Sequence, residues 1–178
     1  LCEKTFHHKI LDKLISLAEF NSVLDLGCGT AYLNKFFDES KLYTGADLPD
    51  LINYSAKRNY PELNYIECDM ITDNMEWIKA YDLIVLSGVI DIMEQPLKVL
   101  AKILDSASKY VILHRQETSL DKTHAIKNSS YGGYTYHSII NRYSLTGLFR
   151  EKKYEVIAKF NLDFGWNNGG DSFLLKKI

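Results

Sequence analysis

The residues with the clearest chemical potential lie near the amino terminus, where an acid, two glycines and a second acid follow within a short span. Asp25, Gly27 and Gly29 end the apolar run that begins at Val23, and Asp47 comes 18 positions after Gly29. Glycines at such a turn let the backbone approach a ligand and adopt positive φ. A carboxylate at the end of the next strand can accept two hydrogen bonds from a ribose. The spacing therefore predicts a pocket for a nucleotide-like ligand.

Asp25, Gly27 and Gly29 resemble the first motif of the class I S-adenosylmethionine-dependent methyltransferases, in which an acid is followed by three alternate glycines. Ala31 takes the place of the last glycine, one small residue for another. The resemblance implies S-adenosylmethionine as the cofactor and S-adenosylhomocysteine as the product. It also implies that Asp25 balances the ammonium of the cofactor, directly or through water, and that Asp47 binds the ribose.

Further positions resemble the later motifs of this family. Asp69 and Met70 follow a short strand, as in the third motif, where a carboxylate accepts from the adenine amine and the next residue offers its backbone N–H. Leu48, next to Asp47, is placed to pack on the adenine, and Ser87 ends a strand like that of the fourth motif. The cofactor-binding residues that the resemblance implies are Asp25, Gly27, Cys28, Gly29, Asp47, Leu48, Asp69, Met70 and Ser87.

A dinucleotide-dependent oxidoreductase is the main alternative, because its fingerprint also begins with two alternate glycines. That fingerprint requires a third glycine where this chain has Tyr32, and a bulky side chain there would hold the helix away from the strand. A chain of 178 residues also leaves no room for a separate substrate domain. A third possibility is a non-catalytic interaction module with the same fold. The intact glycine loop, Asp47 and Asp69 argue against it.

The overall composition favours a globular protein that acts on a small acceptor. Hydrophobic residues make up 46% of the chain and charged residues 25%, the net charge is -2 and the pI is about 6.2. This balance, with few and scattered arginines, argues against nucleic acid as a partner. No apolar run is long enough to span a membrane, and no secretory signal opens the chain. Three widely spaced cysteines without metal-ligand spacing favour a cytoplasmic location and predict no metal site.

Histidines and carboxylates in the second half of the chain supply candidate bases. A hydroxyl acceptor needs a base, and a neutral histidine near pH 7 suits that task best. His114 follows the fifth predicted strand and His137 lies in the stretch beyond it, so these two are the predicted catalytic residues. Asp91 and Glu117 are alternative bases. An ordinary hydrogen-bonded histidine remains an equally open interpretation of either one.

Residues 114–141 are predicted to form a lid that binds the acceptor. They are polar, aromatic and glycine-bearing without a clear period, and a connection of this length in a compact domain is usually functional or disordered. Arg115 is placed to hold a carboxylate or phosphate, and Tyr134 and Tyr136 to wall the pocket by stacking. The alternative is a surface insertion without catalytic meaning. The expected acceptor is a small molecule, with an oxygen of a sugar or other metabolite as the first hypothesis.

Alternating apolar strands and amphipathic helices must position these residues. The sequence predicts one α/β domain over residues 1–178, a three-layer sandwich with an N-terminal helix in residues 1–20. The resemblance implies a seven-stranded, mostly parallel sheet of order 3-2-1-4-5-7-6 with strand 7 antiparallel. The first predicted strand is the apolar run that ends at Leu26, and the others cover Leu42–Ala46, Leu63–Glu67, Tyr81–Ser87, Tyr110–Leu113, Tyr154–Leu162 and Ser172–Lys177. The predicted helices cover Thr5–Glu19, Thr30–Phe37, Pro49–Asn59, a segment from Pro96 and Ser144–Lys152. Because the chain begins at Leu1 rather than at Met, the sequence also leaves open whether a segment precedes it.

Overall fold

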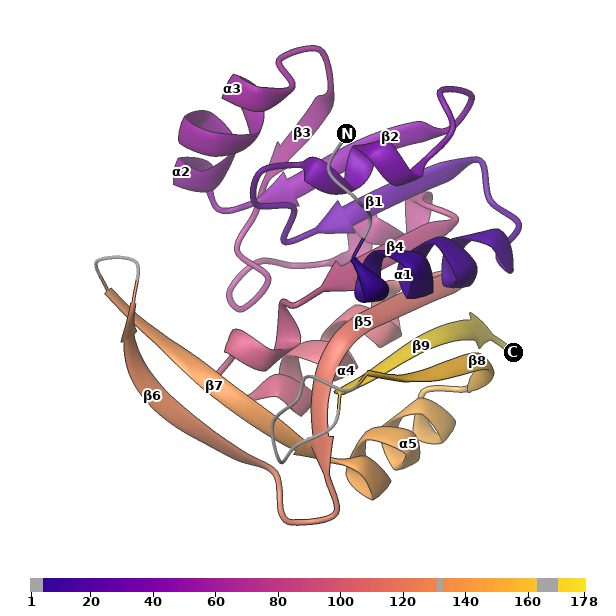
Figure 1. Ribbon diagram of the computed structural model, residues 1–178, viewed down its shortest axis with the longest axis vertical. Helices are drawn as coiled ribbons and strands as arrows, with labels where there is room; N and C mark the ends of the chain where they lie inside the picture. Colours follow the sequence, from indigo (N-terminus) through magenta and orange to yellow (C-terminus); the bar gives the residue numbers. More distant parts are fainter. Residues whose placement is uncertain (1–4, 131–132, 163–169) are drawn as a thin grey trace.

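The computed structural model describes residues 5–130, 133–162 and 170–178, and it shows a twisted sheet with helices on both faces (Figure 1). Its strands are β1 Ser22–Leu26, β2 Leu42–Asp47, β3 Asn64–Glu67, β4 Leu83–Ser87, β5 Tyr110–Ser119, β6 His124–Ser130, β7 Gly133–Asn141, β8 Tyr154–Leu162 and β9 Gly170–Lys177. Its helical segments are α1 Phe6–Ser16, η1 Tyr32–Phe36, α2 Pro49–Leu51, η2 Ile52–Ala56, α3 Lys57–Asn59, η3 Glu76–Ala80, η4 Ile90–Ile92, α4 Pro96–Ser106 and α5 Arg142–Glu151. The predicted α/β architecture is confirmed.

Seven of the strands form the predicted sheet. The strands β3, β2, β1, β4 and β5 pair in parallel in that order, which brings their carboxyl ends to one edge. The strand β9 then pairs antiparallel with β5, and β8 pairs antiparallel with β9. In chain order β8 and β9 correspond to the sixth and seventh predicted strands, so the order 3-2-1-4-5-7-6 is confirmed for this part of the sheet.

The stretch at residues 114–141 differs from the expected irregular lid. The strand β5 runs on to Ser119, six residues past the predicted end at Leu113, and β6 and β7 form an antiparallel hairpin. The hairpin reaches away from the seven-stranded sheet and joins it where β7 pairs with the end of β5 (Figure 1). The strands were missed because the extension of β5 is mostly buried yet consists of polar residues, so it shows neither an apolar run nor an alternation of apolar and polar types. The binding of an acceptor by this stretch stays a prediction.

Three helices also differ from the prediction. The predicted helix Thr30–Phe37 is a 3₁₀ segment, η1, and it starts after Ala31, whose left-handed backbone cannot continue an α-helix. The predicted helix Pro49–Asn59 is present as the consecutive segments α2, η2 and α3, in which η2 has π geometry. The last helix, α5, begins earlier than predicted because the Asn141 side chain accepts a hydrogen bond from the Ser144 N–H at 2.8 Å.

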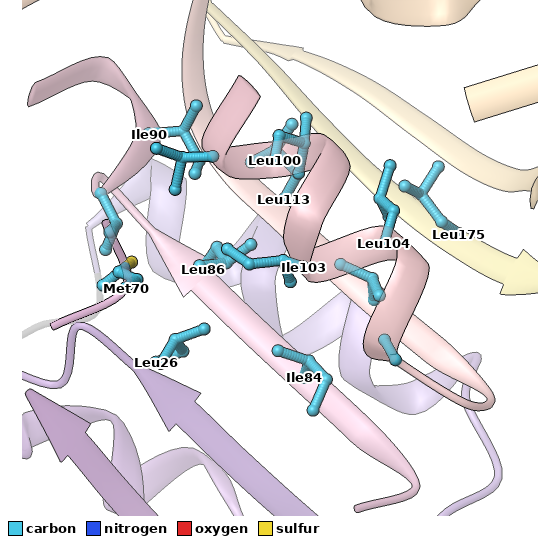
Figure 2. Close-up of a cluster of buried hydrophobic side chains, with 14 of the residues drawn as sticks. Leu26, Met70, Ile84, Leu86, Ile90, Leu100, Ile103, Leu104, Leu113 and Leu175 are labelled. Carbon is cyan, nitrogen blue, oxygen red and sulfur yellow. The ribbon is translucent and has the colours of Figure 1, made fainter. Parts of the chain in front are cut away.

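A buried apolar layer between α4 and the sheet fixes the carboxyl end of β4. Figure 2 shows Leu100, Ile103 and Leu104 of α4 facing Ile84 and Leu86 of β4. All five side chains are fully buried, and each contributes about 1.5–3 kcal/mol through loss of contact with water. This packing holds the strand that leads into Ser87 and Gly88.

The opposite face of the sheet is covered by α1, which packs against β5, β9 and β8 (Figure 1). Its buried side chains are Ile10, Leu11 and Leu14, which share one stripe of the helix. Because this stripe docks on the sheet, the first turn of α1 comes to lie over the carboxyl ends of the central strands. That turn carries His7 and His8.

Candidate functional site

The glycine loop is a tight turn held by β2. The N–H groups of Gly27 and Cys28 both donate to the Ala46 carbonyl, at 2.7 and 3.1 Å. The φ angles are 81° at Gly27 and 52° at Gly29, so both glycines adopt a conformation that favours their type. Ala31 also has positive φ, 57°, at the position where the resembled motif has its third glycine. The turn therefore keeps the shape of a three-glycine loop.

Asp47 lies directly against this loop. Its Oδ2 atom accepts a hydrogen bond from the Gly29 N–H and its Oδ1 atom one from the Leu48 N–H, both at 2.8 Å. These two bonds leave further lone pairs on both oxygens for a ligand. The Leu48 side chain is 47% exposed beside them, which is unusual for a leucine so close to the sheet. A carboxylate and an apolar side chain are thus presented together next to the turn, as a ribose and an adenine require.

Asp25 lies under the loop rather than on its surface. Its side chain is 1% exposed and accepts a hydrogen bond from the Tyr43 hydroxyl at 2.7 Å. Burial is the main cause that raises the pKa of Asp25 to about 7, and the hydrogen bond from Tyr43 opposes this shift. A nearby ligand ammonium would favour the charged carboxylate.

Asp25→Asn is expected to flatten the pH dependence of folding stability. The unfolded carboxyl ionises near 3.8 and the folded one near 7, so between these pH values the folded state holds an extra proton and loses stability as the pH rises. The free energy of unfolding falls by about 3–4 kcal/mol by pH 8. The asparagine variant does not show this fall, because its side chain does not ionise. Urea unfolding of both proteins at pH 4.5 and pH 8 measures the difference. Parallel pH profiles would contradict this account.

The remaining predicted cofactor residues lie around the same turn. Cys28 is buried, its Sγ lying within 2.9 Å of where a Cβ on Gly45 would be, so only its backbone faces the loop. Met70 is buried beneath Gly27. Asp69 is half-buried in the loop after β3, where it accepts from the Ile71 N–H at 2.8 Å. The structure therefore brings the residues from all four motif positions to one edge of the sheet.

A cavity of about 170 Å³ opens at this edge between α1, η1, the end of β4 and the middle of β5. It is smaller than a typical ligand site, which indicates that it covers only one end of a bound molecule. The residues that line it are His7, His8, Leu11, Tyr32, Leu33, Ser87, His114 and Arg115. It contains Ser87 of the predicted cofactor set, His114 of the predicted catalytic pair and Arg115.

His7 and His8 bring the first turn of α1 into the same site. Both side chains are half-buried and line the cavity, with the His7 ring centroid 5.8 Å from that of His114. Burial is the main cause that lowers the pKa of His7 to about 4. The helical spacing of the sequence carries a signal for this position, because His7 falls on the same stripe of α1 as the buried Leu11 and Leu14.

His114 is almost fully enclosed at the base of the cavity. It is 1% exposed, and its Nδ1 atom is 2.9 Å from the Ser172 hydroxyl. Burial, followed by the charge of Arg115, lowers the pKa of His114 to about 3. The imidazole is therefore neutral across the physiological range.

His137 and Glu117 form a pair at the base of the hairpin. The Nε2 atom of His137 lies 2.5 Å from Glu117 Oε2, and the Glu117 side chain is 10% exposed against 38% for His137. Asp91, just beyond β4, is close enough for the charges of Arg115, Glu117 and His137 to act on it. Burial is the main cause that raises the pKa of Asp91. The structure thus brings three predicted bases, Asp91, Glu117 and His137, near one another, although none of them lines the cavity.

The two tyrosines of the hairpin are less enclosed than predicted. Tyr134 is 72% exposed, and the Lys127 ammonium lies 4.2 Å from its ring centroid. Desolvation raises the pKa of Tyr136, and the hydrogen bond between its hydroxyl and Glu94 raises it further. Neither residue lines the cavity described above.

A larger hollow of about 650 Å³ lies at the other end of the strands. Its lining includes Asn21, Lys41 and Lys109, which precede β1, β2 and β5. Ligands of parallel α/β sheets bind beyond the carboxyl ends of the strands. This hollow is therefore separate from the candidate site.

Across residues 5–130, 133–162 and 170–178, no three His, Cys, Asp or Glu side chains are placed to hold a metal ion. Within the same part of the chain, no helix has the length and apolar character needed to cross a membrane.

Comparison with known proteins agrees with this geometry. A protein-family model described as a methyltransferase domain matches residues 4–159. A search of curated proteins finds no significant match in sequence.

Solved structures with similar folds share little sequence with this chain. An S-adenosylmethionine-dependent methyltransferase from Clostridium acetobutylicum superposes with a TM-score of 0.64 at 14% identity, covering 99% of this chain and 92% of its own. One from Methanosarcina mazei gives 0.70 at 13% identity, covering 93% and 97%. The amino pentose methyltransferase CalS10 from Micromonospora echinaspora gives 0.64 at 13% identity, covering 97% and 90%. The family match spans most of the sequence and the glycine turn meets Asp47 as the motifs require, so this chain belongs to the methyltransferase domain family.

Proposed function

We propose that the protein transfers a methyl group from S-adenosylmethionine to a hydroxyl oxygen of a small molecule and releases S-adenosylhomocysteine. The observation that carries the proposal is the contact of Asp47 with the Gly29 N–H, which sets a ribose-binding carboxylate against the turn that admits the cofactor. In this proposal Leu48 packs on the adenine, and Asp69 and the Met70 N–H bind its polar edge. Asp25, Cys28 and Ser87 lie at the methionine end.

The acceptor side of the site supports a hydroxyl acceptor. The cofactor supplies, when bound, a methyl group activated by a sulfonium. The chain then has to hold the acceptor oxygen in line and remove its proton. We assign proton removal to His137, which is partly exposed, and its orientation to Glu117, 2.5 Å away. His114 is a poorer base because its pKa is lowered to about 3.

A sugar is the first acceptor to test. Besides the amino pentose methyltransferase CalS10, the similar structures include the N-terminal domain of EvdMO1 in the presence of S-adenosylhomocysteine and D-fucose, with a TM-score of 0.67 at 11% identity. A magnesium protoporphyrin IX methyltransferase from Synechocystis is also similar, with a TM-score of 0.66 at 12% identity, so other metabolites belong in the same screen. The buried thiols of Cys28 and Cys68 support the proposed cytoplasmic location.

Calorimetry with S-adenosylhomocysteine and with NADH, side by side, tests the proposal. Binding of S-adenosylhomocysteine alone supports it. Binding of NADH alone would support an oxidoreductase, and binding of neither would support an interaction module. The antiparallel placement of β9 beside β5 already disfavours a dinucleotide fold, which ends on a parallel strand.

Asp47→Asn is expected to weaken S-adenosylhomocysteine binding by about 10- to 100-fold. The amide keeps the volume of the carboxylate, but its NH₂ group replaces an oxygen that accepts from a backbone N–H. The asparagine side chain also has only one oxygen that can accept from the ribose. Asp50→Asn, an exposed acid of α2, is the matched control. Calorimetric titration of both variants gives the comparison, and equal affinities would show that Asp47 does not bind the cofactor.

A further inference from the structure

Three polar side-chain atoms around the small cavity are buried without a partner. They are His7 Nδ1, His114 Nε2 and Arg115 Nε, and all three residues line the same space. Buried polar atoms in folded proteins are nearly always hydrogen-bonded. Among the residues that the structure describes, only two other buried side-chain atoms lack a partner, so this concentration marks a place where a polar ligand group belongs.

The hydrogen bonds around Ser172 show which proton His114 carries. The Ser172 hydroxyl oxygen accepts from the Arg115 N–H at 3.2 Å, and it lies 2.9 Å from His114 Nδ1. A serine hydroxyl has one proton to donate, and within the described part of the chain Nδ1 is its available acceptor. Nδ1 of the neutral ring therefore accepts, and the proton is on Nε2. His114 presents an N–H donor to the cavity.

Arg115 presents a second set of donors. Its guanidinium is packed over Gly88, where an added Cβ would lie 2.3 Å from Nη2, so only glycine permits this approach. The described residues include no carboxylate within ion-pair distance of Arg115. Asp91 is near enough for the two charges to interact, but it is not at ion-pair distance. A half-buried guanidinium with no ion-paired carboxylate among the described residues, beside a neutral N–H donor, favours an acceptor-only, singly charged group.

We propose that Arg115 and His114 bind a ligand carboxylate in the cavity beneath the first turn of α1. The inference rests on the proposed function, and it gives His114 the role of a donor instead of a base. Two molecules in the reaction can bring such a group: the amino-acid end of the cofactor, or an acceptor that is itself a hydroxy acid. The cavity volume of about 170 Å³ suits one end of a molecule in either case.

Arg115→Gln, compared with the wild type and with the exposed Arg150→Gln as the matched control, tests this site. Each protein is titrated with S-adenosylhomocysteine and with 5′-methylthioadenosine, which lacks the amino-acid end. Each is also assayed with labelled S-adenosylmethionine on paired hydroxy acids and their primary amides. A loss of about 10-fold or more in S-adenosylhomocysteine affinity, with 5′-methylthioadenosine unaffected, assigns the carboxylate to the cofactor. A rise of similar size in KM for hydroxy acids but not for amides assigns it to the acceptor.

The inference is overturned if Arg115→Gln changes neither quantity while the wild type binds S-adenosylhomocysteine. A wild type that binds no S-adenosylhomocysteine overturns the proposed function instead, so the two failures are distinct. If the glutamine variant unfolds, Arg115→Lys takes its place in the same measurements, because lysine keeps the charge and removes the planar set of donors. That variant is expected to show a loss of about 3-fold or more in the same titration, and an unchanged affinity and KM would count against the site.

Discussion

His137→Gln is expected to lower kcat by about 100- to 10,000-fold on the hydroxyl acceptor that the wild type methylates. In our proposal the imidazole takes the acceptor proton, and glutamine keeps a polar side chain without a basic nitrogen. Glu117 holds the ring through the 2.5 Å contact, so Glu117→Gln is expected to give a smaller loss of the same kind. Steady-state kinetics with labelled S-adenosylmethionine measure both variants.

The control for this prediction is His124→Gln in the same hairpin. His124 is an exposed residue of β6, and its Nδ1 atom lies 3.1 Å from the Lys122 carbonyl oxygen. Its replacement is expected to leave kcat unchanged, and all three variants are expected to bind S-adenosylhomocysteine like the wild type. A His137→Gln protein with wild-type kcat would remove the base from the mechanism and would point to Asp91, the carboxylate nearby.

Gly27→Ala is expected to lower the free energy of unfolding by about 2–4 kcal/mol and to abolish measurable cofactor binding. A Cβ at this position would lie 2.5 Å from Val89 Cγ2 and 3.0 Å from its Cγ1, and the backbone φ of 81° is strained for any L side chain. Either Val89 or the loop must move, and both changes widen the turn that faces the ligand. Urea unfolding and calorimetry provide the two measurements.

Gly29→Ala measures the loss of stability caused by positive φ alone, without a clash between the added Cβ and its neighbours. Its φ is 52°, and nothing lies within 4 Å of the added Cβ. Ala31 shows that this chain accepts alanine at a similar φ of 57°. Gly29→Ala is therefore expected to cost about 1 kcal/mol. Equal losses of stability for the two alanine variants would contradict the steric role assigned to Gly27.

The cofactor side of the site was predictable because its residues follow strands with strong patterns. Asp47 and Ser87 each end an apolar run, and parallel strands bring their carboxyl ends to one edge. The match of Asp25, Gly27 and Gly29 to a known motif then fixed which edge mattered. For this half of the chain, local pattern and global fold agree.

The acceptor side was less predictable because its contacts are remote in sequence. The pair of His137 with Glu117 depends on β7 meeting the end of β5, a pairing that no local pattern specifies. The tautomer of His114 depends on Ser172, 58 positions away on an antiparallel strand. Residues 131–132 of the predicted lid and residues 163–169 lie outside the described residues.

A crystal structure of the protein with S-adenosylhomocysteine tests the central claim most directly. The account predicts both ribose hydroxyls within hydrogen-bond distance of the Asp47 carboxylate, the adenine between Leu48 and the Asp69–Met70 loop, and the amino-acid end beneath α1. A ligand that binds elsewhere, with Asp47 contacting only the Gly29 and Leu48 N–H groups as it does now, would contradict it.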